Sequence, residues 1–202
     1  VAYIGQLYAD FGGCMDIVIG VSEMFGVPLA ENFRRPFAAT NLSELWRRWH
    51  ITLGAWVRDY VLYPVLKSRW MGGLRRFCKK RFGKKAAREI PTYLGMFITW
   101  FCVGFWHGGS WKYIFGSGLF FFAMIAGGML LEPVFKKLIA LLRINTEAWS
   151  WKFFRQVRSF ALFTAAVSFD RRSSFGAGLA AWKTVLTEWN PGALRHGAIL
   201  QL

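Results

Sequence analysis

The chain has 202 residues, of which 54% are hydrophobic and only 18% are charged, and its mean hydropathy is +0.29. Soluble domains of this length carry more charge, so the composition argues against a soluble enzyme and favours a membrane protein with basic cytoplasmic loops. The net charge of +15 would also suit a nucleic-acid-binding protein. The basic residues flank apolar segments instead of forming one basic face, however, so no nucleic-acid partner is expected.

The N-terminal segment predicts an apolar helix that carries acidic residues. Val1–Val27 is interrupted by Asp10, Asp16 and Glu23, which suggests a helix facing the protein interior or a cavity. We expect the aspartates, like Asp59, to pair with arginines inside the bundle and not to act in catalysis.

A connection and two helical segments are predicted next. Pro28–Thr40 is interpreted as a connecting segment, and Asn41–Glu44 offers caps for a helix that continues to His50. Ile51–Leu66 is apolar except for Arg58 and Asp59. It is short for a full membrane span, which needs about 20 residues, so a re-entrant or buried segment is expected.

The sharpest change in composition comes at Lys67–Glu89, which is predicted to be a basic cytoplasmic loop. Its ten basic residues are Lys67, Arg69, Arg75, Arg76, Lys79, Lys80, Arg81, Lys84, Lys85 and Arg88. Such a segment can also lie along anionic lipid headgroups, so membrane lipids are expected partners.

The remaining elements predict further helices. Ile90–Trp111 and Tyr113–Leu131 are uncharged runs of spanning length, and Trp149–Phe169 is expected to enter a last span through an amphipathic turn. Ala177–Trp189 is interpreted as a peripheral helix. The predicted fold is thus an all-α, multi-pass protein of the plasma membrane with some short or re-entrant helices. Residues 1–202 are expected to form the C-terminal part of a single membrane domain.

One histidine stands inside an otherwise uncharged run, in the string GFWHGGSW at residues 104–111. An ionisable side chain at membrane depth is costly and usually functional, so His107 is the first candidate for catalysis, with a purely structural histidine as the alternative. A neutral imidazole can accept the proton of an attacking hydroxyl during acyl transfer, and burial would keep it neutral. Backbone N–H groups near Gly108 and Gly109 are candidate oxyanion donors.

A second candidate site lies in the run LWRRWHITL at residues 45–53. One interpretation is an interfacial belt of tryptophans and arginines at headgroup depth. The other is a site in which His50 handles a proton while Arg47 and Arg48 bind an anionic group such as a phosphate.

Other chemistry is not indicated. His196 lies in a polar tail and is interpreted as a surface residue, and the chain after Pro191 is predicted to be weakly ordered. The three cysteines are widely spaced and suggest neither a disulfide framework nor a metal site. Hydrolase elbows, phosphate loops and zinc-protease motifs do not occur.

Taken together, several ordered motifs resemble the membrane-bound O-acyltransferase (MBOAT) family. They are LYADFGG (7–13), DIVIG (16–20), MFG (24–26), ENFRRP (31–36), SELWRRWHITL (43–53), WVRDY (56–60) and GFWHGGSW (104–111). The resemblance is strong over about the first 130 residues, and is greatest to the bacterial branch of alginate O-acetyltransferases and D-alanyl transfer proteins. Lys112 departs from the family pattern, in which a neutral residue is common.

The resemblance implies a catalytic role for His107, in a tunnel that crosses the membrane, and an assisting role for His50. The expected substrate-binding residues are Trp46, Arg47, Arg48, Trp49 and Trp106. No bound cofactor is implied, because the donor is an acyl thioester of CoA or of a phosphopantetheine carrier protein. The acceptor is a hydroxyl of an exported glycan, or a periplasmic or extracellular acyltransferase partner.

Acetyl transfer to a cell-surface polysaccharide is the leading functional hypothesis. D-alanyl transfer toward teichoic acid is the alternative with the same chemistry. A transporter or scaffold in which His107 lines a conduction path is the alternative without catalysis.

Overall fold

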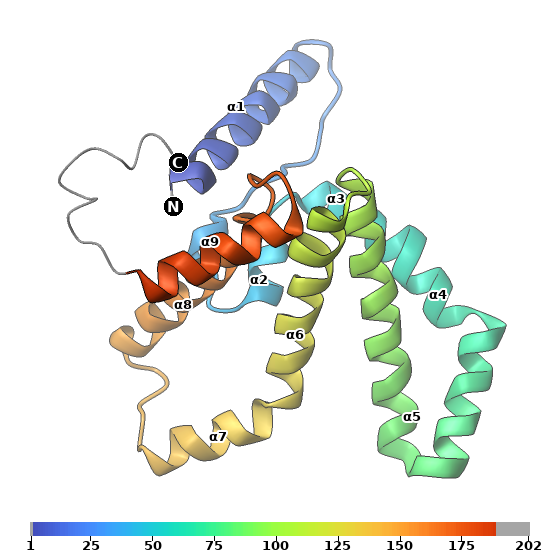
Figure 1. The fold of residues 1–202 in the computed structure, drawn as a ribbon. Coiled ribbons are helices and arrows are strands. Elements are labelled where there is room, and N and C mark those ends of the chain that lie inside the picture. Colours follow the sequence, from blue (N-terminus) through green and yellow to red (C-terminus); the bar gives the residue numbers. More distant parts are fainter. Residues whose placement is uncertain (1, 189–202) are drawn as a thin grey trace.

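The computed structural model describes residues 2–188 as an assembly of helices (Figure 1). Among these residues there is no strand, only an isolated antiparallel bridge between Phe33 and Trp49, so the predicted all-α class is confirmed. His196 and the tail after Pro191 lie outside the described residues. The elements in chain order are α1 (Ala2–Met24), η1 (Pro36–Ala38), α2 (Leu42–Trp46), α3 (Ile51–Val57), η2 (Arg58–Leu62), α4 (Tyr63–Lys67), α5 (Arg69–Trp106), η3 (Lys112–Leu119), α6 (Phe120–Leu130), α7 (Glu132–Leu141), α8 (Trp149–Val167) and α9 (Phe175–Thr187).

The helix expected between Asn41 and His50 is shorter than predicted. Asn41 does cap α2, since its side-chain oxygen accepts a 2.8 Å hydrogen bond from the Glu44 N–H. The helix nevertheless ends at Trp46, because the backbone that follows bonds to the chain around Phe33 instead. Each backbone group can serve only one of these two patterns, and here the long-range pairing prevails.

The basic segment Lys67–Glu89 is a helix and not the predicted loop. Helix α5 begins at Arg69, where the Ser68 hydroxyl caps the Met71 N–H at 3.3 Å. Lysine, arginine and alanine all have high helix propensity, which the charge-based prediction left out. The chain turns sharply at Gly83, whose φ of 86° suits a residue without a Cβ. In Figure 1 the two parts of α5 run in different directions from this turn.

Only part of the predicted membrane topology is found. Among residues 2–188, the helical stretch Lys112–Leu130 is the one that is long and apolar enough to cross a membrane, with a mean hydropathy of 1.8. The run Ile90–Trp111 does not meet this criterion, since α5 ends at Trp106. Trp149–Phe169 does not meet it either, although α8 covers most of that run. The helix expected over Ala177–Trp189 is found as α9, Phe175–Thr187, and Trp189 lies outside the described residues.

The acidic residues do not behave as expected. Within the described part of the chain, Asp10 and Asp16 form no ion pair, and both lie exposed on α1. Asp59 does pair with an arginine, but with its exposed neighbour Arg58, at 2.9 Å. The acids in α1 therefore do not tie that helix to the bundle.

An aromatic and aliphatic core holds α1, α2, α6 and α8 together. Trp49 packs on Phe33 at a ring distance of 5.0 Å and on Phe163 of α8 at 5.1 Å. The fully or nearly buried members of this core are Ile4, Ala39, Leu42, Leu45, Trp49, Phe121, Phe163, Ala166 and Val167. The segment that carries the RRWH run is thus anchored by its tryptophan, which leaves the following histidine free to face the other way.

Two glycines, Gly104 of α5 and Gly118 of η3, allow the backbones of these two helices to touch. A Cβ on Gly104 would lie 2.7 Å from the Tyr113 carbonyl oxygen, and one on Gly118 would lie 2.6 Å from the Trp100 carbonyl oxygen. Both distances are shorter than real Cβ contacts, so any side chain at either position would push the two helices apart. In Figure 1 these elements meet near the end of α5, from which α5 and α6 diverge like two legs.

We predict that Gly118→Ala lowers the free energy of unfolding by about 1–3 kcal/mol, as overpacking does in other tightly packed interiors. Gly127→Ala in α6 is the matched control, because a Cβ there meets nothing within 4 Å. It should be neutral or stabilising, by up to about 1 kcal/mol. The measurement is thermal unfolding of the purified full-length protein in detergent. Equal unfolding temperatures for the two variants would contradict the close-packing argument.

Candidate active site

His50 is held in an unusual backbone conformation immediately before α3. Its φ and ψ are 45° and 55°, in the left-handed region, which costs a non-glycine residue on the order of 1–3 kcal/mol. Contacts on both sides compensate for this strain. The Phe11 ring of α1 meets the imidazole edge to face at 4.6 Å, and Nδ1 of His50 lies 3.1 Å from Oδ1 of Asn32.

His107 lies at the end of a helix and not within one. It follows α5 as its C-cap, with its N–H bonded to the Val103 carbonyl at 3.1 Å. Among the described residues its side chain is exposed, which corrects the expectation of a deeply buried histidine. Gly108 and Gly109 turn the chain away with φ values of 138° and 69°.

One of the two predicted oxyanion donors beside His107 is already engaged. The Gly108 N–H donates to the Phe105 carbonyl at 3.2 Å, so it is occupied as a donor in this conformation. Gly109 has a left-handed backbone that a side chain would strain. Its N–H stays the candidate donor of the two.

The two histidines share a tryptophan. The Trp106 ring lies 6.2 Å from the His50 ring and 4.8 Å from the His107 ring, measured between centroids. On the far side of His107, the Tyr113 ring stacks at 6.3 Å. The structure thus brings together three of the predicted site residues, Trp106, His50 and His107, from segments far apart in the sequence.

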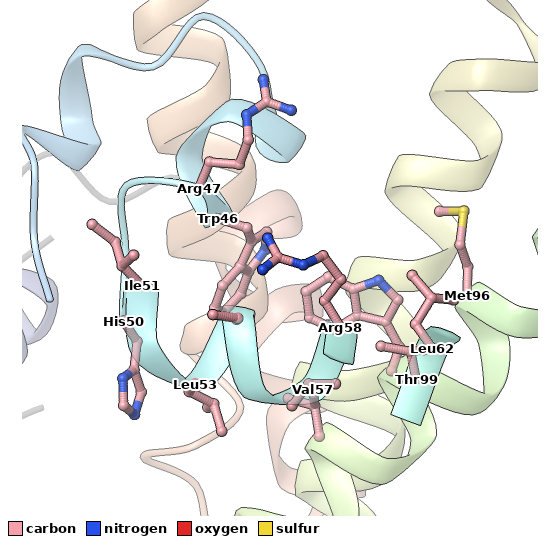
Figure 2. A pocket seen from close by; sticks show the side chains of 14 residues that line it. Trp46, Arg47, His50, Ile51, Leu53, Val57, Arg58, Leu62, Met96 and Thr99 are labelled. Carbon is pink, nitrogen blue, oxygen red and sulfur yellow. The ribbon is translucent and has the colours of Figure 1, made fainter. Parts of the chain in front are cut away.

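A largely apolar cavity of about 500 Å³ adjoins His50 (Figure 2). It lies between α3, η2 and the apolar part of α5, and it reaches Val103, one helical turn before His107. Its lining consists of Trp46, Arg47, His50, Ile51, Leu53, Gly54, Ala55, Val57, Arg58, Leu62, Met96, Thr99, Trp100 and Val103. The indole N–H of Trp46 is buried and has no hydrogen-bond partner among residues 2–188, but it is closed off from solvent and does not open onto the cavity.

Two cations belong to the cavity. In Figure 2 the Arg58 side chain extends toward Trp46, whereas the Arg47 guanidinium extends away from the other labelled side chains. Arg58 also binds Asp59 through two nitrogens, at 2.9 and 3.3 Å. An anionic group entering here would therefore meet Arg58 near Trp46, with Arg47 as an outer cation.

Arg48 and Trp49 have other neighbours. Arg48 pairs with Glu44 at 2.5 Å, and Trp49 is 6% exposed within the aromatic core. Burial acts to raise the pKa of the Glu44 carboxyl, but hydrogen bonds from Thr40 and Arg48 outweigh it and hold that pKa below its usual value. In the RRWH run the outer two residues, Arg47 and His50, thus line the cavity, and the inner two, Arg48 and Trp49, are structural.

Sequence reasoning did not single out three contributors to this site. Arg58 was interpreted as a charge within an apolar run and as part of the WVRDY motif, with no role in the site, and Trp100 only as part of a span. Asn32 was assigned to a connecting segment, although it is just 3% exposed and contacts His50. Asn32 also belongs to the ENFRRP motif of the family resemblance, but a polar residue in a loop gives no periodic signal, so its contact with His50 is seen only through the long-range pairing. Within the described chain no group of three or more potential metal ligands comes together.

The sequence model of the membrane-bound O-acyltransferase family matches residues 1–169, which include every element of this site. The chain belongs to this family. The match also agrees with the long apolar helix Lys112–Leu130, since the family is membrane-bound.

Relatives within the MBOAT family differ in what their names say they modify. The chain is 32% identical to a probable alginate O-acetylase AlgI of Pseudomonas putida, over 96% of this chain and 35% of that protein. It is 34% identical to a peptidoglycan O-acetyltransferase of Helicobacter pylori, over 56% of this chain and 18% of that protein. It is 35% identical to a teichoic acid D-alanyltransferase of Bacillus subtilis, over 55% and 26%. The chain spans about a third or less of the length of these curated relatives.

We predict that substitution of Arg48 destabilises the protein more than substitution of its neighbour Arg47. Arg48→Met should lower the free energy of unfolding by about 1 kcal/mol, because it removes the partly buried charged hydrogen bond to Glu44. Arg47→Met should change it by less than about 0.5 kcal/mol, as expected for an exposed side chain. Thermal unfolding of the full-length protein measures both. An equal loss in Arg47→Met would show that Arg47 is structural too.

Proposed function

We propose that this chain is part of a multi-pass plasma-membrane enzyme that transfers an acyl group, preferably acetyl, from a thioester to a hydroxyl of an exported cell-surface polysaccharide. The observation that carries the proposal is the convergence of His50 and His107 on Trp106, beside an apolar cavity, in a member of the MBOAT family. The active residues in this proposal are His107 and His50.

The reaction needs a base close to the acceptor hydroxyl. His107 accepts the hydroxyl proton while the alkoxide oxygen forms a bond to the thioester carbonyl carbon. Collapse of the tetrahedral intermediate breaks the carbon–sulfur bond, and the leaving thiolate takes up the proton held by the His107 imidazolium, which restores the neutral base. The Gly109 N–H is the proposed donor to the developing oxyanion. His50 assists, either by relaying the proton or by polarising the carbonyl.

The cavity supplies a place for the donor. Its apolar lining suits a small acyl group and the thioester arm. Arg58 and Arg47 suit the phosphate of CoA or of a phosphopantetheine carrier protein. The thioester is a substrate in this scheme, so no resident cofactor is required.

Acetyl transfer is preferred over D-alanyl transfer because two alginate O-acetylase relatives align over nearly the whole chain. They match 96% and 94% of it, whereas three further alginate O-acetylases match 56% and the D-alanyltransferase relative matches 55%. The D-alanyl alternative uses the same histidines and the same cavity, and differs only in the donor. Direct comparison of the two donors distinguishes them.

The partners follow from the same picture. An exported glycan, or an acyltransferase partner outside the membrane, receives the acyl group, and a soluble donor or carrier protein delivers it. The basic first part of α5, with exposed Trp70, Phe77 and Phe82, suits contact with anionic lipid headgroups.

We predict that His107→Ala abolishes transfer, with a loss of at least about 10²-fold in kcat, since general base catalysis contributes about 10²–10⁴-fold. The assay uses full-length protein in lipid vesicles and follows labelled acetyl groups from acetyl-CoA into the polysaccharide fraction. A parallel assay uses a D-alanyl carrier-protein thioester. Retained transfer in a folded His107→Ala protein would refute the assigned role.

A second prediction tests the cavity as the donor site. Gly54→Leu adds a side chain at the cavity wall, where a Cβ meets only the Trp46 carbonyl at 3.8 Å. It should raise the KM for the donor on the order of tenfold, which corresponds to about 1.4 kcal/mol of lost binding. Gly73→Leu in α5 is the matched control, because its Cβ meets nothing within 4 Å and the residue does not line the cavity. An unchanged KM in Gly54→Leu would move the donor site elsewhere.

A further inference from the structure

We propose that Asn32 is a positioning residue that fixes the neutral His50 imidazole as a proton acceptor at Nε2. The inference rests on the proposed acyl-transfer function and chooses between the two roles left open for His50. It concerns a residue outside the histidine motifs, and it depends on which ring nitrogen carries the hydrogen.

Asn32 is rigidly placed. Its backbone carbonyl accepts the Ile51 N–H at 3.1 Å, and two residues further on the Arg34 N–H donates to the Arg48 carbonyl at 3.0 Å. These two bonds flank the antiparallel bridge between Phe33 and Trp49. With only 3% of its surface exposed, the Asn32 side chain has few alternative conformations.

The orientation of the Asn32 amide follows from its neighbours. The atom nearest to His50 also lies 3.3 Å from the Thr52 backbone N–H, which can only donate. That atom must therefore be the oxygen, Oδ1, because a flipped amide would place two donors against each other. The Thr52 hydroxyl, at 2.7 Å, provides a further hydrogen bond to the same oxygen.

The orientation of the amide determines the tautomer of the ring. Since Oδ1 is an acceptor, Nδ1 of His50, 3.1 Å away, must carry the hydrogen. A neutral imidazole has one N–H, so Nε2 keeps its lone pair. His50 is one of the residues that line the cavity, and the Phe11 ring packs on the imidazole at a right angle, 4.6 Å between centroids, and restricts its rotation.

This tautomer has a mechanistic consequence. A neutral His50 held in this way has no N–H to offer an acyl carbonyl, because its one hydrogen is committed to Asn32. It can accept a proton at Nε2, and Asn32 then still binds the Nδ1 hydrogen of the imidazolium. His50 thus acts as a proton relay for the His107 base and not as an oxyanion donor.

Solid-state NMR of the wild-type protein tests the tautomer without any need for activity. Full-length protein labelled with ¹³C and ¹⁵N in histidine is placed in lipid bilayers, and the His50 signals are assigned by their loss in His50→Gln. We expect a protonated Nδ1 and an unprotonated Nε2 in the neutral ring. The opposite tautomer would overturn the proposal.

Two isosteric variants then test the positioning role. Asn32→Asp keeps an acceptor facing Nδ1, whereas Asn32→Leu keeps the volume and removes the acceptor. We expect Asn32→Leu to lower kcat on the order of 10²-fold with the donor KM within about twofold of the wild type, and Asn32→Asp to recover most of that loss. Thr52→Val, which leaves the His50 hydrogen bond in place, is the control and should lose less than Asn32→Leu.

A purely structural Asn32 predicts that activity follows folding. Asn32→Leu would then lower the unfolding temperature, because it leaves the Thr52 donors without an acceptor, and kcat per folded protein would stay at the wild-type value. Folding of each variant is checked by thermal unfolding, and activity is followed as thiol released from acetyl-CoA. Wild-type activity in Asn32→Leu, or a greater loss in Asn32→Asp, would overturn the proposal. Full transfer activity in a folded His107→Ala protein would instead refute the proposed function, so the two failures are distinguishable.

Discussion

The contact between Gly104 and the start of η3 is the constraint on which the site depends. At this point two helices touch backbone to backbone, which fixes where α5 ends and where the next helix begins. His107 lies in the short turn between them, so its position is determined by the van der Waals contact at Gly104 and not by a polar interaction. Small residues serve this purpose in membrane helices because they allow close approach and good van der Waals packing.

The second half of the site is organised by hydrogen bonds instead. The chain around Phe33 pairs with the chain around Trp49, and the aromatic core fixes that pair from one side. The same pairing places a strained residue, His50, at the edge of the cavity. The Gly104 contact thus positions His107 and the Phe33–Trp49 pairing positions His50, and both histidine rings lie next to Trp106. The site therefore requires both.

Much of this arrangement could be predicted from the sequence, and the reasons for the rest are physical. The helical class, the cap at Asn41 and the long apolar helix after Lys112 follow from local patterns. The early end of α2 does not, because it results from pairing with residues distant in the sequence. Lys67–Glu89 was predicted as a loop from its charge alone, although its residues favour helix. The exposed position of His107 could not be predicted, since periodicity does not locate a helix end within an uncharged run.

The left-handed backbone at His50 limits what this position can hold. β-branched residues are strongly disfavoured there, whereas glycine, asparagine and aspartate adopt such a conformation more easily. The choice of residue at position 50 is therefore limited both by the backbone geometry and by the need to accept a proton. Histidine is one of the few residues that tolerates this backbone and also titrates near neutral pH in its unperturbed form. A deep mutational survey of protein stability would therefore show depletion of β-branched residues at position 50 even under conditions that do not require acyl transfer.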